Sequence, residues 1–167
     1  MRHLAVIIIA AIGTIAFLES RADWSEMHRW NRAFGDMSLV LVACSMAIGP
    51  LSRLWPHFRH AVPWRRETGI YGVFLAIIHT IIILDGWVAW DIVRLFGFEI
   101  HPSTGTYVMV QQGFSLANAV GIAALLYGIA LALTSNNRSQ KLLGGSIWKF
   151  DGCFQGLYGT GVFGPFR

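Results

Sequence analysis

Long uncharged runs alternate with short charged segments along the whole chain. A bilayer core of about 30 Å needs about 20 mainly apolar residues to be crossed by one helix. Four runs meet or approach this length, and the first two of them need flanking residues to reach it. The pattern predicts an all-α integral membrane protein, a bundle of about four transmembrane helices at residues 4–20, 34–52, 68–90 and 113–134.

The segments between these runs hold most of the charged residues and are predicted to be loops. We expect segments 19–36 and 91–112 on the outer side, and the polar segment after the last run on the inner side together with segment 52–67. The prolines of 52–67, and His101-Pro102 with Gly105, are typical of turns. Residues 1–149 thus form the predicted transmembrane domain.

Residues 150–167 differ in character from the rest of the chain. They are rich in glycine, which disfavours a helix by up to about 1 kcal/mol per residue relative to alanine. We therefore predict an irregular glycine-rich tail that does not span the membrane.

Composition and charge agree with a membrane protein. Hydrophobic residues make up 54% of the chain and charged residues 13%, whereas a soluble domain carries about 25% charged residues. The net charge of +4 could suggest nucleic acid, but the cations lie in the short loops, as the positive-inside rule describes. We expect a multi-pass protein of the cell inner membrane, with the lipid bilayer and not nucleic acid as its partner.

The distribution of the cations also predicts an orientation. With both termini in the cytoplasm, the inner side holds nine of the 13 Lys and Arg residues: Arg2, Arg53, Arg59, Arg65, Arg66, Arg138, Lys141, Lys149 and Arg167. Residues 4–18, preceded by Arg2 and His3, also resemble a secretory signal. Because no small-x-small cleavage pattern follows them, we favour an uncleaved anchor helix.

His79 is the one histidine inside an apolar run, near the middle of 68–90. Ionisable residues at this depth are costly and are candidates for function. Gly72 and Gly86, seven residues before and after, lie within about 20° of its direction, and Ala76 lies close to the same stripe. A haem macrocycle could stand on such a face, with the imidazole as axial ligand. The stripe is equally typical of helix packing, so both interpretations stay open.

Three further polar residues fall at similar outer depth on different predicted helices. Asp36, Asp85 and Asn118 could together conduct protons or bind a quinone or an ion, as in a transporter or channel. The alternative, which we favour, is that each is simply hydrated at the interface. His28, His57, His60 and His101 are expected to be surface histidines in loops.

Several short motifs occur in an order that resembles bacterial ferric reductase-like transmembrane domain proteins. This family includes the haem-binding membrane subunit of the methionine-sulfoxide reductase type. The motifs are Gly49-Pro50-Leu51-Ser52-Arg53-Leu54, Arg65-Arg66-Glu67-Thr68-Gly69-Ile70-Tyr71-Gly72, Ala76-Ile77-Ile78-His79, Leu131-Ala132-Leu133-Thr134-Ser135-Asn136, Leu143-Gly144 and Trp148-Lys149.

The resemblance implies a helical bundle that holds b-type haem between histidines on different helices. It implies that electrons pass across the membrane from a separate donor protein to a separate acceptor, since no flavin site is visible in the chain. His79 matches the family's ligand to the haem iron on the earlier histidine-bearing helix, and the cofactor face would include Gly72, Ala76 and Gly86.

The chain departs from the family after Trp148-Lys149. In the family this segment leads into another helix that carries the partner histidines, whereas here it leads into the glycine-rich tail, which has no histidine. The chain is therefore predicted to lack that helix, as a truncated relative would. Bis-histidine haem would then require a second protein, or a homodimer in which two His79 side chains face one iron. The alternative function is a non-catalytic membrane anchor or partner subunit without haem.

Overall fold

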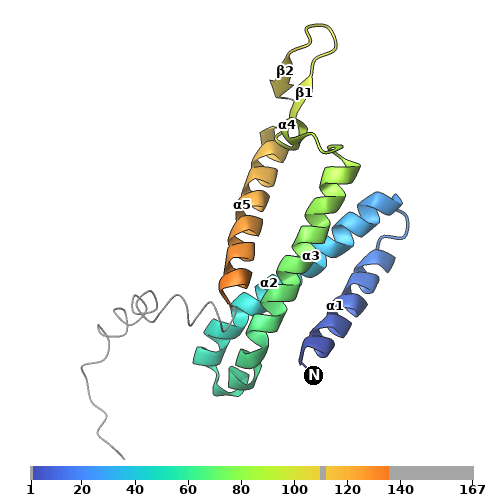
Figure 1. Ribbon diagram of the computed structural model, residues 1–167. Coiled ribbons are helices and arrows are strands. Elements are labelled where there is room, and N and C mark those ends of the chain that lie inside the picture. The colour runs from blue at the N-terminus through green and yellow to red at the C-terminus, as the bar shows by residue number, and fades with distance from the viewer. Residues whose placement is uncertain (1, 110–111, 136–167) are drawn as a thin grey trace, which may run out of the picture. The chain divides into compact units, whose positions relative to one another are not determined.

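The computed structural model describes residues 2–109 and 112–135 of the chain, so the predicted tail at 150–167 lies outside the described residues. The described part is mainly helical, and the predicted all-α class is confirmed (Figure 1). Residues Met1–Ala132 make up one compact unit. The elements in chain order are α1 (Arg2–Glu19), α2 (Glu26–Leu54), the 3-10 helix η1 (Pro56–Trp64), α3 (Arg65–Gly86), α4 (Ile92–Leu95), β1 (Phe98–Ile100), β2 (Tyr107–Met109) and α5 (Gln112–Thr134).

Four helical stretches in the described part of the chain are long and apolar enough to cross a membrane. They are α1, α2, the stretch Pro56–Gly86 and the stretch Gly113–Thr134. Few of their residues are buried by the protein itself, and none is buried in the span of α5. Apolar side chains that face outward in this way suit a lipid surrounding. A helix also satisfies its own backbone hydrogen bonds, as a segment within lipid must.

Two helices begin earlier than the sequence pattern predicted. α2 starts at Glu26 rather than at residue 34, so more than half of the predicted outer loop 19–36 is helix. With 29 residues, α2 is about 44 Å long, more than the membrane core requires. α3 starts at Arg65 instead of residue 68. A hydropathy pattern marks only the part of a helix that lies in lipid. The helix itself can continue through a polar segment that contains no glycine or proline.

α3 also ends earlier than predicted, at Gly86 rather than residue 90. Ala89 and Trp90 have φ angles of 48° and 63°, in the left-handed region, which cannot continue a right-handed helix. The Trp90 backbone N–H turns back and donates to the carbonyl oxygen of Leu84 at 2.9 Å.

Both predicted loops that flank α3 contain regular structure. Most of 52–67 is helical, because η1 fills the interval between α2 and α3. Segment 91–112 contains α4 and an antiparallel hairpin in which Phe98 pairs with Met109 and Ile100 with Tyr107. The predicted turn is confirmed: Gly105 has a φ of 63°, and the His101 N–H donates to the carbonyl oxygen of Thr106 at 2.9 Å.

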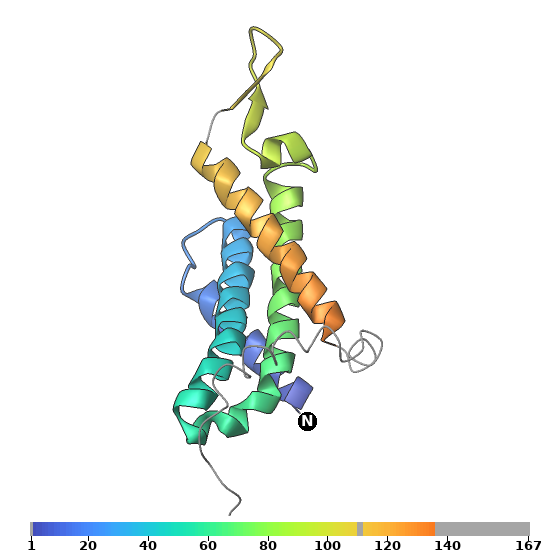
Figure 2. The ribbon, with the colours of Figure 1, turned by 90° about the vertical axis from the view of Figure 1, so that its left-hand side faces the viewer.

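The buried core lies where α1, α2 and α3 meet. These helices run alternately up, down and up (Figure 1), and α2 and α3 lie next to each other in Figure 2. The core residues are Ala10 of α1, Met37 and Leu41 of α2, and Leu75 of α3. Phe17, Phe34, Tyr71 and Ile78 pack around them.

The contact between α2 and α3, which we call the α2–α3 seam, repeats every seven residues. A seven-residue spacing is close to two turns of a helix and so keeps one face on the partner helix. Side chain to backbone hydrogen bonds of 2.7–2.8 Å join the helices at three points spaced by seven on both helices: Ser45 to Arg65, Ser38 to Gly72, and His79 to Asn31.

Two contacts show how α5 approaches the preceding elements. The Asn118 Nδ2 donates to the carbonyl oxygen of Leu95 at 2.8 Å. Further along, a Cβ atom placed on Gly128 would lie 3.1 Å from Cγ2 of Val73, so α5 approaches α3 closely there.

Candidate functional site around His79

The ring of His79 lies between α3 and α2 and is partly buried. Its Nδ1 is 2.8 Å from the backbone carbonyl oxygen of Asn31. A carbonyl oxygen can only accept, so Nδ1 carries the hydrogen and donates it. In the neutral imidazole the lone pair is then on Nε2. Among the described residues, Nε2 has no hydrogen-bond partner, which leaves this atom available to a ligand.

Gly35 of α2 makes room for this ring. A Cβ atom on Gly35 would lie 2.9 Å from both Cε1 and Nδ1 of His79, closer than real Cβ atoms approach. Asn31 and Gly35 thus fix the position of His79, and neither residue was predicted from the sequence as part of this site. Residue 31 fell within a predicted loop. The signal that could have found it is the recurrence of Asn31, Ser38 and Ser45 at intervals of seven.

Gly72 and Gly86 do not border open space, as a face for a macrocycle would require. A Cβ atom on Gly72 would lie 2.8 Å from Cγ2 and 3.2 Å from the backbone nitrogen of Val42, and one on Gly86 would overlap the sulfur of Met27. Both neighbours belong to α2. At these two glycines the stripe is therefore a helix-packing surface, which was the alternative interpretation.

The same packing bears on the homodimer in which two His79 side chains would face one iron. Val42 and Met27 of α2 in the same chain cover Gly72 and Gly86, so the structure gives no support to a dimer that uses these two glycines as its contact surface. Ala76, the fourth residue of the predicted set, is partly buried, and its carbonyl oxygen accepts a hydrogen bond from Thr80 at 2.8 Å.

The three polar residues at the outer ends of the helices do not share one site. Asp36 forms an ion pair with Arg21. Asp85 accepts a hydrogen bond from Nε1 of Trp90 at 3.3 Å, and Asn118 donates to Leu95. Since each residue has a different neighbour, their arrangement gives no support to a transport path through all three.

The other histidines lie elsewhere and have partners of their own. His28 was predicted to lie in a loop, but it belongs to α2. It contacts Ser25 at 2.7 Å and the ring of Trp87. His101 lies 2.9 Å from Ser103 Oγ. In residues 2–109 and 112–135, no three His, Cys, Asp or Glu side chains are grouped so that they could hold a metal ion. Among the described residues, His79 is the histidine that lies near the middle of a helix long enough to span a membrane.

These features define the class of protein: a multi-pass helical membrane protein with an oriented histidine inside one spanning helix. Comparison with known proteins then agrees with the resemblance found in the motifs. The chain is 31% identical over 134 residues to the protein-methionine-sulfoxide reductase heme-binding subunit MsrQ of Ralstonia nicotianae, covering 80% of this chain and 54% of that protein. It is 28% identical over 131 residues to the protein of the same name from Rhodospirillum rubrum, covering 74% and 53%.

A more distant similarity extends to the magnetosome protein MamZ of Magnetospirillum gryphiswaldense, 25% identical over 119 residues, or 71% of this chain and 16% of MamZ. No protein-family model matches the chain, and no solved structure matches it. The chain spans about half the length of the MsrQ proteins that it matches. It is thus similar, over most of its own length, to part of the haem-binding membrane subunits of methionine-sulfoxide reductase.

Proposed function

We propose that this chain is a membrane electron-transfer protein of the ferric reductase-like type, and that Nε2 of His79 is an axial ligand of a b-type haem. The observation that carries the proposal is the hydrogen bond from Nδ1 of His79 to the carbonyl oxygen of Asn31. Histidines that bind metals almost always donate their other ring nitrogen in this way, which fixes the tautomer and the ring orientation.

Gly35 of α2 leaves room for the His79 ring, and α3 is largely apolar on either side of the histidine. Because α2 covers Gly72 and Gly86, a haem would have to reach Nε2 from a side that these two glycines do not form. A bound b-type haem supplies a one-electron iron couple, whose potential depends on the axial ligands and on burial. Among the described residues, the nearest histidine along the seam, His28, contacts Ser25 and Trp87 instead of His79, so we propose that the other ligand comes from outside these residues. The electron donor and acceptor would be separate proteins on the two sides of the inner membrane.

A second candidate function is a membrane anchor or partner subunit that holds no haem. The observation in its favour is that Gly72, His79 and Gly86 all face α2, so that His79 also serves helix packing. On this alternative the hydrogen bond to Asn31 is structural, and the lone pair of Nε2 has no function. The two candidates differ in whether the chain binds haem at all.

The test is the absorption spectrum and haem content of the detergent-purified chain, compared with those of His79→Ala and His101→Ala. We expect the wild type and His101→Ala to show a b-type Soret band and the reduced α band, and His79→Ala to lose most of its haem. Full haem content in His79→Ala would disprove the assignment of the ligand. A wild-type chain that stays colourless when haem is supplied would favour the anchor.

A further inference from the structure

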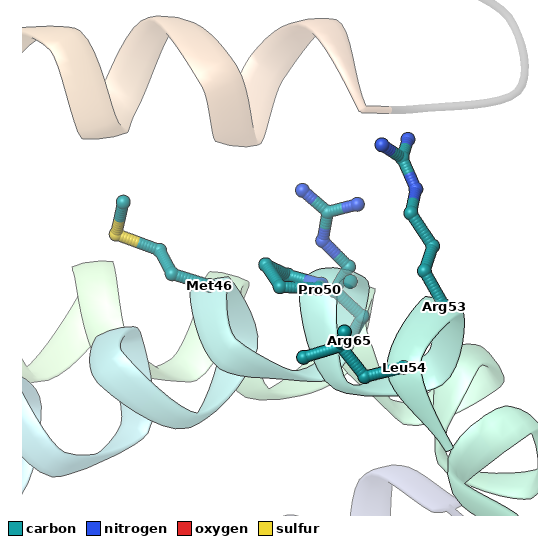
Figure 3. Close-up of a pocket in the computed structure, with 6 residues that line it drawn as sticks. Met46, Pro50, Arg53, Leu54 and Arg65 are labelled. Carbon is teal, nitrogen blue, oxygen red and sulfur yellow. The ribbon is translucent and has the colours of Figure 1, made fainter.

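An open cavity of about 510 Å³ lies on the surface where α2 ends and α3 begins. It is distant in sequence from His79, and the proposed function does not use it. Figure 3 shows that the side chains of Met46, Arg53 and Arg65 extend to the same side of α2. The residues that line the cavity are Met46, Gly49, Pro50, Arg53, Leu54 and Arg65.

The α2–α3 seam fixes the backbone position of one of the two arginines. Ser45 Oγ donates to the carbonyl oxygen of Arg65 at 2.7 Å, which fixes the backbone at the start of α3. A Cβ atom on Gly49 would lie only 3.4 Å from Nη1 of Arg65, so the guanidinium lies across this glycine. An alanine at position 49 would make ordinary van der Waals contact with the guanidinium, whereas a long side chain there would compete with it for the same space.

The positive charge of the cavity is not neutralised by the protein. Within the residues that the structure describes, neither Arg53 nor Arg65 forms an ion pair. The acid nearest in sequence, Glu67, is turned away: its side chain is 7% exposed and its Oε1 lies 3.6 Å from Nε of Arg2. Two guanidinium groups beside one cavity thus favour an anionic ligand, and arginine binds phosphate oxygens well through its paired donors.

The rest of the cavity wall is apolar, and the cavity opens at the membrane surface. Met46 and Leu54 are 68% and 69% exposed. The adjoining η1 has no buried residue. Trp55, just before η1, is 55% exposed, and Phe58 within η1 is 42% exposed. Exposed tryptophan is typical of the lipid headgroup level. Met46 precedes Arg53 by seven residues, or about 10 Å along α2, so the apolar wall reaches deeper into the membrane than Arg53.

We infer that this cavity binds an anionic phospholipid. The phosphate group contacts Arg53 and Arg65, and an acyl chain lies along Met46 and Leu54. Basic pockets between transmembrane helices are known to bind anionic lipid headgroups. A free phosphate would use only the arginines, and would leave the apolar wall exposed to water.

The test uses the full chain in detergent and native mass spectrometry with phosphatidylglycerol as probe and phosphatidylcholine as reference. The variants are Arg53→Gln and Arg65→Gln, with Arg59→Gln as the matched control, because Arg59 is an exposed arginine of η1 that does not line the cavity. We expect phosphatidylglycerol to bind in preference to phosphatidylcholine. Each cavity variant should bind it about fivefold more weakly, and Arg59→Gln less than twofold more weakly.

A second variant, Gly49→Leu, keeps every charge but fills the cavity and displaces Arg65. It should lose the bound phosphatidylglycerol while keeping its thermal unfolding temperature within a few degrees. Equal losses in all three arginine variants would show only general attraction to a charged surface, and normal binding by Gly49→Leu would place the lipid elsewhere. If inorganic phosphate at millimolar concentration displaces the lipid, the site recognises a free anion, and the inference of a lipid site is wrong.

Discussion

The contacts of a single side chain, His79, connect the fold of this protein with its proposed chemistry. In a lipid surrounding, an imidazole is expensive to bury unless its polar atoms are satisfied. The Asn31 carbonyl oxygen satisfies Nδ1, and Gly35 allows the ring to lie close enough for this bond. Nε2 remains as the one polar atom of the ring that has no partner among the described residues.

The first prediction concerns Gly35→Ala. The added methyl group would lie 2.9 Å from the His79 ring, so the ring must move and its hydrogen bond to Asn31 must lengthen or break. We expect a loss of about 1–2 kcal/mol in the free energy of unfolding, together with a weaker or shifted haem spectrum where haem is bound. Gly113→Ala is the control, because a Cβ atom there meets nothing within 4 Å. An unchanged unfolding temperature and spectrum in Gly35→Ala would show that the structure can accommodate the added methyl group beside the His79 ring.

The second prediction concerns the ion pair between Arg21 and Asp36, whose side chains are 24% and 29% exposed. Asp36→Asn leaves the guanidinium of Arg21 without its counter-charge, and Nη1 of Arg21 is already buried without a hydrogen bond. We expect a loss of about 1–3 kcal/mol, less than for a fully buried pair.

The matched control for the ion pair is Glu99→Gln, which removes the partner of Arg94. That pair is 4.0 Å long and its side chains are about half exposed, so its loss should cost less than about 0.5 kcal/mol. Thermal unfolding in detergent measures both variants. Equal effects from Asp36→Asn and Glu99→Gln would mean that burial does not strengthen the inner pair.

At the scale of the elements, the α2–α3 seam determines how closely two spanning helices approach. Lipid is as apolar as a leucine side chain, so helices in a membrane associate mainly through close packing and polar contacts. The seam supplies both: glycines at positions 35, 49, 72 and 86 and hydrogen bonds from Ser38, Ser45 and His79. The seven-residue spacing brings them to one face.

The third prediction compares two glycines in the middle of helices. Gly72→Ala would place a methyl group 3.2 Å from the backbone nitrogen of Val42, and a helix backbone cannot move aside as a side chain can. We expect a loss of about 1–3 kcal/mol, as is usual for overpacking. Gly121→Ala in α5 meets nothing within 4 Å and should be neutral or stabilising, since alanine favours helices. Both are measured by unfolding in detergent, and a neutral Gly72→Ala would show that the helices can separate at no cost.

Some of these structural features could be predicted from the order and spacing of residues in the sequence, and others could not. Hydropathy located all four spanning stretches, because burial in lipid requires an unbroken apolar run. The same signal could not locate the ends of α2 and α3, since polar residues extend a helix beyond the membrane. Periodicity identified the face that carries Gly72, His79 and Gly86. It could not show that α2 covers this face, nor that the partner of His79 is a backbone carbonyl group, which every residue possesses.

At the scale of the whole molecule, the ends of the helices carry the charge and the middle carries the packing. The N-terminus and the segment between α2 and α3 lie at the same end of the bundle. Arg2 Nη1 donates to the carbonyl oxygen of Pro63 at 3.2 Å, and Arg2 also pairs with Glu67. The cations of α1, η1 and the start of α3 are thus gathered at one end, where we expect them to act together as an orientation signal.

The fourth prediction is that this end faces the cytoplasm and the β1–β2 hairpin faces the other side. α3 runs from the basic end to the segment that carries the hairpin, and its length of 22 residues, about 33 Å, is enough to cross the membrane core. Reporters fused at residue 60 and residue 100 should therefore report opposite compartments, the cytoplasm at 60 and the periplasm at 100. A single-cysteine labelling experiment with a membrane-impermeant maleimide at the same positions is an independent check. If both positions report the same side, α3 does not span the membrane and the topology proposed for this chain is wrong. If the two sides are exchanged, the bundle stands but the positive-inside assignment of its termini fails.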